Sequence, residues 1–284
     1  MLISPIINNY QPKTNYRPTF KAHYDQGQIR ENVGDGVRYS HGHIHNYSIL
    51  LRNFRLFLEL PKLLEEKFPN GAKIYDYGCS VGYEPVSLDL GLHNYFPKEQ
   101  VKKYTPIIAR DNNPYILREA KRFKLKFEKD ELERLAFLKN INQEEFFHPH
   151  RKGIDGQLVC GCSDRLKKDI IFEHGDLFDD LKYDRLSDEP CVVLLRNSWQ
   201  YMTKNGKEEL SDLLFEKLKS GSIVIIGSHD VSSSANECLL NSGFKNIKGD
   251  YEIKDCEYPK LEFICNGKKE PAPSDIELYC FEKP

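Results

Sequence analysis

Short apolar runs alternate along this chain with segments in which apolar residues recur every three or four positions. The short runs predict five strands, at residues 73–77, 104–109, 170–173, 191–195 and 222–227. The longer spacing predicts helices at residues 47–60, 84–90, 115–123, 130–138 and 207–218, with Pro61 as a break or a new helix start. Because strands and helices alternate, the pattern predicts a doubly wound α/β sheet of Rossmann-like type.

Three segments depart from this alternation. Residues 1–40 are polar and lack periodicity, which predicts a poorly ordered tail before one domain at residues 41–284. Residues 144–168 contain the turn dipeptide Asp155-Gly156, which predicts an antiparallel β-hairpin inserted into the fold. Residues 276–281 are typical of a late antiparallel strand.

Polar residues follow four of the predicted strands, at the edge where open α/β sheets bind ligands. They are Asp76, Gly78, Ser80, Gly82 and Glu84 after the first strand, Asp111 after the second, His174, Asp176 and Leu177 after the third, and Arg196, Asn197 and Tyr201 after the fourth. The loop GCSVGY lacks the spacing of a dinucleotide fingerprint, and the chain has no G-x-x-x-x-G-K-[ST] motif. A glycine loop followed by a second-strand acid fits S-adenosylmethionine (SAM), although the loop alone also fits a strand-to-helix turn without a ligand.

Composition narrows the function classes. The formal net charge is -2, from 41 basic and 43 acidic residues, which argues against a dedicated nucleic-acid binder. No apolar run approaches the roughly 20 residues of a membrane helix, so no membrane insertion is expected. The N-terminal residues do not resemble a signal peptide, and the eight cysteines are scattered, so we expect reduced thiols and a cytoplasmic protein.

The segment CSVGYEPVS, residues 79–87, resembles the Ser-x-Gly-x-Glu-Pro-x-Ser segment of the CheR family, the methyltransferases that esterify glutamates on bacterial chemotaxis receptors. Further similar segments follow the family's order. They are HNYSILLRNFRLF, IIARDNNPYILREAKR, EEFF with the predicted hairpin, IIFEHGDLFDD, LLRNSWQYM and LKSGSIVIIGSHD. The resemblance covers about residues 43–230. It implies a SAM-dependent methyltransferase fold with an inserted antiparallel β-subdomain.

The resemblance also implies roles for individual residues. Asp76 and Gly78 would shape the methionine end of the cofactor pocket, Glu84 would lie beside the cofactor, and Asp111 would bind the ribose hydroxyls. The other expected cofactor contacts are Asp176 and Leu177 at the adenine, with Ser80, Gly82, Arg196 and Asn197. Arg52 and Tyr201 match the family's motif arginine and tyrosine, and are expected to serve catalysis.

Several positions depart from the family pattern. Leu50-Leu51 replace an aromatic pair, Asp176 replaces asparagine, residues 198–200 replace an aliphatic stretch, and Met202 stands in place of phenylalanine. The family's N-terminal helical domain is largely missing ahead of the first predicted strand. These departures leave two alternatives open: a methyltransferase of the same fold that acts on a small molecule, and a non-catalytic SAM-binding protein.

Two histidine-containing clusters resemble metal sites. His41, His43 and His45 border the predicted tail. His148, His150, Cys160 and Cys162 flank the predicted hairpin turn, where they form either four tetrahedral ligands or ordinary alternating strand residues. We expect no metal at either cluster.

The combined expectation is a cytoplasmic enzyme that uses SAM to methylate protein glutamate side chains. A carboxylate is already a nucleophile at neutral pH, so no general base is needed. The resemblance implies a methyl-accepting chemotaxis receptor as the protein acceptor. The insert carries basic residues that suit an acidic partner, namely Arg151, Lys152, Arg165, Lys167 and Lys168.

Overall fold

The computed structural model describes residues 49–127, 131, 135–152, 158–249, 251, 262–265, 268–271 and 274–284, and only the backbone of residues 149–152, 262–265 and 268–271. The tail expected at residues 1–40, the Asp155-Gly156 turn and part of the helix expected at 130–138 lie outside this range.

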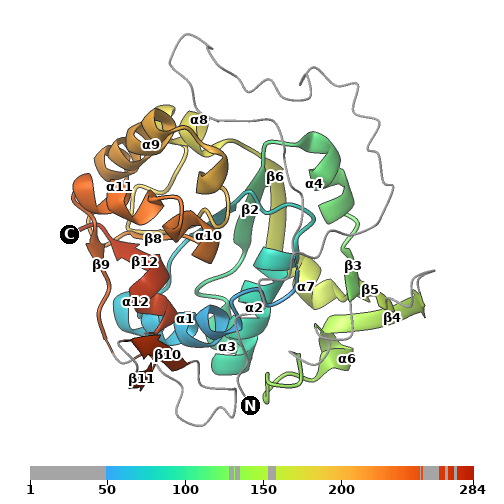
Figure 1. Cartoon of the computed structure of the whole chain (residues 1–284). Coiled ribbons are helices and arrows are strands. Elements are labelled where there is room, and N and C mark those ends of the chain that lie inside the picture. The colour runs from blue at the N-terminus through green and yellow to red at the C-terminus, as the bar shows by residue number, and fades with distance from the viewer. Residues whose placement is uncertain are drawn as a thin grey trace.

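A seven-stranded sheet forms the centre of the molecule (Figure 1). Its strands, in spatial order, are β6 (Ile170–His174), β2 (Ile107–Asp111), β1 (Ile74–Tyr77), β7 (Val192–Leu194), β8 (Ile223–Ile225), β12 (Cys280–Glu282) and β9 (Lys245–Asn246). Only β12 runs antiparallel to its neighbours β8 and β9. The chain winds outward from β1 to β6 and then returns to the other side of β1 at β7. This reversal confirms the doubly wound fold and places the switch point, where such sheets bind ligands, between β1 and β7.

The central strands are buried on both faces, so their successive side chains enter two different hydrophobic cores. Ile74, Val192 and Leu194 belong to one core, whereas Tyr75 and Val193 belong to the other. This two-residue period explains why the strand sequences are apolar throughout.

Helices cover both faces of the sheet (Figure 1). The first core includes residues of α1 (Phe54–Lys67), α2 (Tyr83–Tyr95), α3 (Lys98–Val101), α4 (Pro114–Ala120), α7 (Asp164–Asp169) and α12 (Asp275–Tyr279). The second includes residues of α8 (Leu177–Lys182), α9 (Lys204–Lys217) and α11 (Ala235–Asn241). Short helical segments complete the list: α6 (Gln143–Phe146), η1 (Trp199–Tyr201) and α10 (Ser228–Val231).

The insert is a three-stranded antiparallel sheet in the order β3 (Lys124–Phe127), β5 (Leu158–Cys162) and β4 (Phe147–Lys152). Strands β4 and β5 confirm the predicted strand pair. The prediction missed β3, and it extended the hairpin through residues that form α7. A further pair, β10 (Glu262–Cys265) and β11 (Lys268–Pro271), is antiparallel.

Two predicted boundaries were wrong for identifiable reasons. The first helix begins at Phe54, not at residue 47, because Leu51 and Asn53 take left-handed backbone angles. It then continues through Pro61. Proline lacks the N–H that would bond the Phe57 carbonyl, and the backbone of Gly91 packs against that oxygen, where a Cβ atom would collide with it.

The strand expected at residues 276–281 is mostly helix. Ser274 caps α12 by accepting hydrogen bonds from the N–H groups of Ile276 and Glu277, so only Cys280–Glu282 is left to form β12. The second strand also begins three residues later than predicted and extends through Asp111.

Candidate functional site

The loop after β1 turns sharply beneath the carboxyl end of the sheet. Gly78 and Gly82 have φ angles of 74° and 96°, which favour glycine. A Cβ atom on Gly78 would lie 2.9 Å from Ser198 Oγ, and one on Gly82 would lie 2.7 Å from the Phe172 ring. The two glycines therefore allow the loop to pack closely between the ends of the neighbouring strands.

Asp111, at the end of β2, ties this loop to the sheet. Its carboxylate accepts hydrogen bonds from the N–H groups of Ser80 and Asn113, both at 2.9 Å. Burial raises the pKa of Asp111, although both hydrogen bonds oppose that rise. A carboxylate has about four acceptor positions, so two remain for ligand hydroxyls.

A buried ion pair joins α2 to the loop after β7. Arg196 donates to Glu84 Oε2 at 2.8 Å, to Asn53 Oδ1 at 2.8 Å and to the Arg52 carbonyl at 3.2 Å. Its guanidinium lies 5.1 Å from the centre of the Phe57 ring. Arg196 therefore has its acceptors within the protein, and its carboxylate partner is Glu84.

Asp76 supplies a second carboxyl group that has no such partner. It is completely buried in β1, and neither of its oxygens has a hydrogen-bond donor in the described part of the chain. Oxygen Oε1 of Glu84 is also buried, and no basic side chain or backbone N–H of the described residues donates to it. Burial and the charge of Glu84 raise the pKa of Asp76 well above its usual range, and Arg196 offsets only part of that rise. A side-chain hydrogen bond between the two acids also raises the pKa of Asp76 and lowers that of Glu84, so Asp76 is the one that holds the proton.

Arg52 and Tyr201 are far apart in the sequence but lie close enough in the fold to interact electrostatically. Both are half-buried. Burial and the charge of Arg196 lower the pKa of Arg52, whereas Glu84, Asp230 and Tyr201 raise it. Burial raises the pKa of Tyr201, and Arg52 lowers it. The structure thus brings together two residues predicted to act together.

The sequence analysis gave no role to Asp230, which organises the loop carrying Asn197 and Tyr201. This buried carboxylate accepts hydrogen bonds from the N–H groups of Asn197, Trp199 and Gly227. Asn197 has a φ of 58°, and its Oδ1 is buried without a donor among the described residues. Asp230 ends a segment that resembles the CheR family, but no pattern in the sequence indicates these bonds.

Asp176 and Leu177 follow β6, as predicted, and here the structure shows a local role. The Asp176 carboxylate caps α8 by accepting from the N–H groups of Phe178 and Asp179, at 3.0 and 3.4 Å. Leu177 is buried in the second core. Their predicted contact with adenine stays a prediction.

The histidines and cysteines considered as metal ligands around the hairpin do not all share one face. His148 pairs with Gly161, and Cys160 pairs with Pro149, so His148 points away from Cys160 and Cys162. His148 is exposed, whereas both cysteines are buried. The strand register therefore favours ordinary alternating residues over a four-ligand site.

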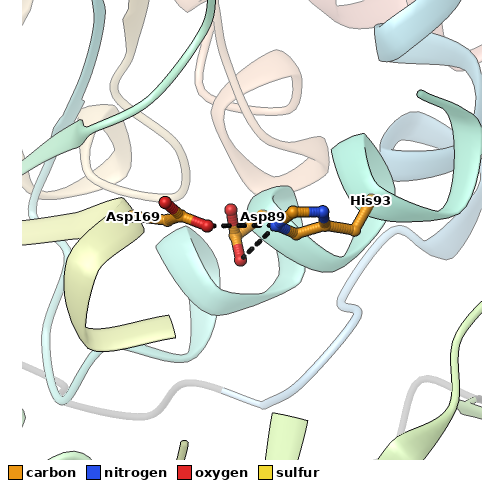
Figure 2. Close-up of side chains that lie close together, drawn as sticks. All are labelled: Asp89, His93 and Asp169. Atoms are coloured by element: carbon orange, nitrogen blue, oxygen red, sulfur yellow. Dashed lines mark hydrogen bonds and ion pairs between the residues drawn. The ribbon is translucent and has the colours of Figure 1, made fainter. Parts of the chain in front are cut away.

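A different cluster, shown in Figure 2, joins α2 to the end of α7. His93 Nε2 lies 3.0 Å from Asp169 Oδ2 and 3.7 Å from Asp89 Oδ2. Arg165 Nη2 lies 2.7 Å from His93 Nδ1 and can only donate, so Nδ1 is the acceptor and the proton is on Nε2, toward Asp169. Since this tautomer has no lone pair on Nε2, the arrangement is a hydrogen-bonded Arg-His-Asp chain rather than a ready metal site.

The residues at the switch point fit a ligand that carries a cation at one end and hydroxyl groups at the other. Asp76 and Glu84 present buried carboxyl oxygens that no basic side chain or backbone N–H of the described residues contacts, and Asp111 keeps acceptor positions beyond the glycine loop. The amino group and the ribose of SAM have these properties.

In the described part of the chain, no helix has the length and apolar character needed to cross a membrane.

Several solved methyltransferase structures resemble this chain at low sequence identity. The methyltransferase domain of a bacterial CtHen1-CN protein is 13% identical, with a TM-score of 0.41, covering 81% of this chain and 98% of its own. A TehB-like SAM-dependent methyltransferase from Corynebacterium glutamicum is 15% identical, with a TM-score of 0.37, covering 80% and 88%. A precorrin-6y C5,15-methyltransferase from Geobacter metallireducens is 14% identical, with a TM-score of 0.34, covering 78% and 84%.

The search of curated proteins found no match. The model of the family "CheR methyltransferase, SAM binding domain" matches residues 51–247, a range that contains every predicted site residue and runs from the residue before Arg52 to just past β9. The chain therefore belongs to the CheR methyltransferase family and is a SAM-dependent methyltransferase.

Proposed function

We propose that this enzyme transfers a methyl group to the carboxylate of a glutamate side chain in a protein acceptor. One observation carries the proposal: the half-buried guanidinium of Arg52 has no hydrogen-bond or ion-pair partner in the described part of the chain. Arg196, its neighbour, is paired with Glu84. Glu84 and Asp230 act on Arg52 only without direct contact, so its guanidinium donors are open to an anionic acceptor.

The other half of the site holds the cofactor. Asp76 and Glu84 would bind its amino group, the loop from Gly78 to Gly82 would pass along it, and Asp111 would accept from its ribose hydroxyls. When bound, SAM supplies an electrophilic methyl group on a sulfonium. Asp76 would ionise on accepting a hydrogen bond from this cation, so the buried carboxyl group would gain a cationic partner in place of its hydrogen bond with Glu84.

The acceptor half needs no general base. A glutamate carboxylate has a reference pKa of about 4.3, so it is already ionised at neutral pH. With SAM bound, the carboxylate oxygen would bond to the methyl carbon as the carbon–sulfur bond broke and its electron pair went to sulfur. Arg52 and Tyr201 would orient the carboxylate, and such positioning supplies roughly 7–11 kcal/mol in favourable cases. The ester product is neutral, so Arg52 loses its ionic partner and product release becomes easier.

The proposed acceptor is a methyl-accepting chemotaxis receptor in the cytoplasm, and the support for it is the family alone. The basic insert agrees with an acidic partner only in part. Arg165 points inward, where it contacts Glu145 at 3.1 Å and His93 at 2.7 Å. Lys167 and Lys168 are exposed on α7, although Lys167 Nζ already pairs with Asp164 Oδ1 at 3.0 Å.

Labelled methyl transfer tests the proposal. The purified protein is incubated with methyl-labelled SAM and receptor-containing membranes, and the labelled product is treated with base. We expect protein-bound label that is released as methanol, as for a carboxyl ester. Arg52→Ala should abolish transfer while SAM affinity stays near the wild-type value. Arg122→Ala is the control, because Arg122 is exposed and contacts only Glu119 in the described residues.

The other outcomes identify the alternatives. Base-stable label on a small molecule would replace the protein acceptor by a small one. Binding of SAM without any transfer would favour a non-catalytic protein. Unchanged transfer by Arg52→Ala would remove Arg52 from the acceptor site.

A further inference from the structure

Asp230 connects the loop after β7 to the loop after β8. It lies in α10, directly after β8, and its side chain is completely buried. One carboxylate oxygen accepts from the N–H groups of Gly227 and Asn197, and the other accepts from the N–H group of Trp199 at 3.0 Å. A single carboxylate therefore fastens the loop after β7 to the loop after β8.

The fastened loop holds a backbone that is unfavourable by itself. Asn197 takes a φ of 58°, a left-handed conformation that costs backbone strain in a residue other than glycine. Gly227 leaves room for it, because a Cβ atom on Gly227 would lie 2.7 Å from Asn197 Cγ. Directly after Asn197 the chain enters η1, which ends at Tyr201. The position of Tyr201 beside Arg52 thus depends on hydrogen bonds to Asp230.

We propose that Asp230 is a positioning residue whose ionised carboxylate holds residues 197–201 in the arrangement needed for methyl transfer, and that its protonation in mild acid releases this loop. The inference rests on the proposed function, since it concerns how Tyr201 is presented to an acceptor. It assigns Asp230 no contact with the cofactor or the acceptor.

The charged groups around Asp230 support its protonation in mild acid. Burial raises the pKa of Asp230 to about 6, against the three backbone N–H groups and then Arg196, which lower it. Arg52 and Tyr201, on the other packed segments, also interact electrostatically with Asp230. His229, on the same helix, has its pKa lowered by burial and by Arg52. A protonated carboxyl group carries no negative charge, and its hydroxyl oxygen is a weaker acceptor, so protonation weakens the three hydrogen bonds.

Release of the loop differs from unfolding, because the pKa of Asp230 shifts in the direction that stabilises the folded protein in acid. The pKa of Asp230 is raised by folding, so protonation favours the folded over the unfolded chain. Acid acting on Asp230 should therefore loosen the loop without lowering the melting temperature. A purely structural role would move stability and loop position together.

The chain contains a reporter at the required place. Trp199 is its single tryptophan. The indole N–H of Trp199 donates to the Leu195 carbonyl at 3.0 Å, and its backbone N–H donates to Asp230. Its fluorescence should change with a midpoint near pH 6, and Asp230→Asn should abolish the transition and give an acid-like spectrum at pH 8. His229→Gln should keep the transition, which excludes titration of the neighbouring histidine.

Two further measurements complete the test. For Asp230→Asn at pH 8 we expect turnover to fall roughly 10–100-fold, as for a displaced reacting group. SAM affinity, measured by calorimetry, should fall much less, because Asn197 is the one proposed cofactor contact on the released loop. A wild-type spectrum without a transition between pH 5 and 7 would overturn the proposal even if Asp230→Asn failed to fold. Loss of the transition in His229→Gln would overturn it too. If no acceptor is methylated, the proposed function fails. The fluorescence measurement would still show whether Asp230 holds residues 197–201.

Discussion

Replacement of Asp76 by asparagine should move two properties of the protein in opposite directions. The substitution keeps the shape of the side chain and removes its ability to carry a negative charge. Asp76 is completely buried, neither oxygen has a donor among the described residues, and its pKa is raised by burial and by Glu84. In the free protein the buried carboxyl group therefore lowers the stability of the fold, whereas in the complex it would bind the cofactor's amino group.

The expected loss of SAM affinity follows from the strength of one hydrogen bond to a charged group. A hydrogen bond to a charged group contributes about 1.5–3 kcal/mol, which corresponds to a loss of roughly 10–150-fold in SAM affinity for Asp76→Asn. Stability should change the other way. An acid whose pKa is raised by folding opposes folding as the pH rises above its unfolded pKa, and asparagine does not. The variant should melt at an equal or higher temperature than wild type, with a gap that grows with pH and vanishes near pH 4.

Calorimetry measures both effects. Binding should ionise Asp76, so wild-type binding should release a proton and tighten as the pH rises, and titrations in buffers of different ionisation enthalpy will detect that proton. Asp76→Asn should lose this proton release. Differential scanning calorimetry without SAM gives the change in stability.

Asp89 provides a matched control on the same helix as Glu84. Asp89 is also completely buried, with no donor to either oxygen in the described structure, and burial and then Asp169 raise its pKa. Asp89→Asn should therefore raise stability as Asp76→Asn does and leave SAM affinity unchanged. Equal SAM affinity of Asp76→Asn and wild type, or a loss of affinity in both variants alike, would refute the assignment of Asp76.

The remaining predictions concern the cofactor, the acceptor and its docking. Asp111→Ala should weaken SAM binding by roughly 1–3 kcal/mol, and a folded variant with unchanged affinity by calorimetry would contradict its placement. Tyr201→Phe should reduce turnover on the order of 100-fold, as for the loss of one donor at a reacting oxygen; a drop in melting temperature without a specific loss of rate would make Tyr201 structural. Replacing Lys167 and Lys168 by glutamate should slow methylation of a protein acceptor and flatten its salt dependence without changing SAM affinity. A variant that methylates the acceptor as fast as wild type at both low and high salt would exclude docking by these lysines.

Sequence patterns predicted those features that depend on local burial. Residues 191–195 are apolar because both faces of β7 are covered, and this property can be read without the fold. The alternation in KLKF, residues 124–127, with exposed lysines and buried Leu125 and Phe127, was a comparable signal for β3 that the sequence analysis missed. The end of α12 depended on one cap, Ser274, which competes with the strand propensity of the residues that follow.

The site was predicted as a set of strand ends, but its connections were not. Asp230 bonds to Asn197 and Trp199 only because β7 and β8 are neighbours in register, with Leu194 opposite Ile225. Such a contact depends on tertiary geometry and leaves no periodic trace in the sequence. The same holds for the orphaned oxygens of Asp76, since sequence shows an acid at a strand end but not whether a cation already neutralises it.

The place of β12 constrains how the protein acquires its fold during synthesis. This strand is made after every other strand of the sheet, yet it lies between β8 and β9 and bonds to both. Until residues 280–282 leave the ribosome, β8 has an unpaired edge formed by Ile223, Val224 and Ile225. An apolar strand edge of this kind is prone to pair with another chain. The nascent enzyme should therefore depend on chaperones, or on rapid completion of its C-terminal segment, to avoid aggregation.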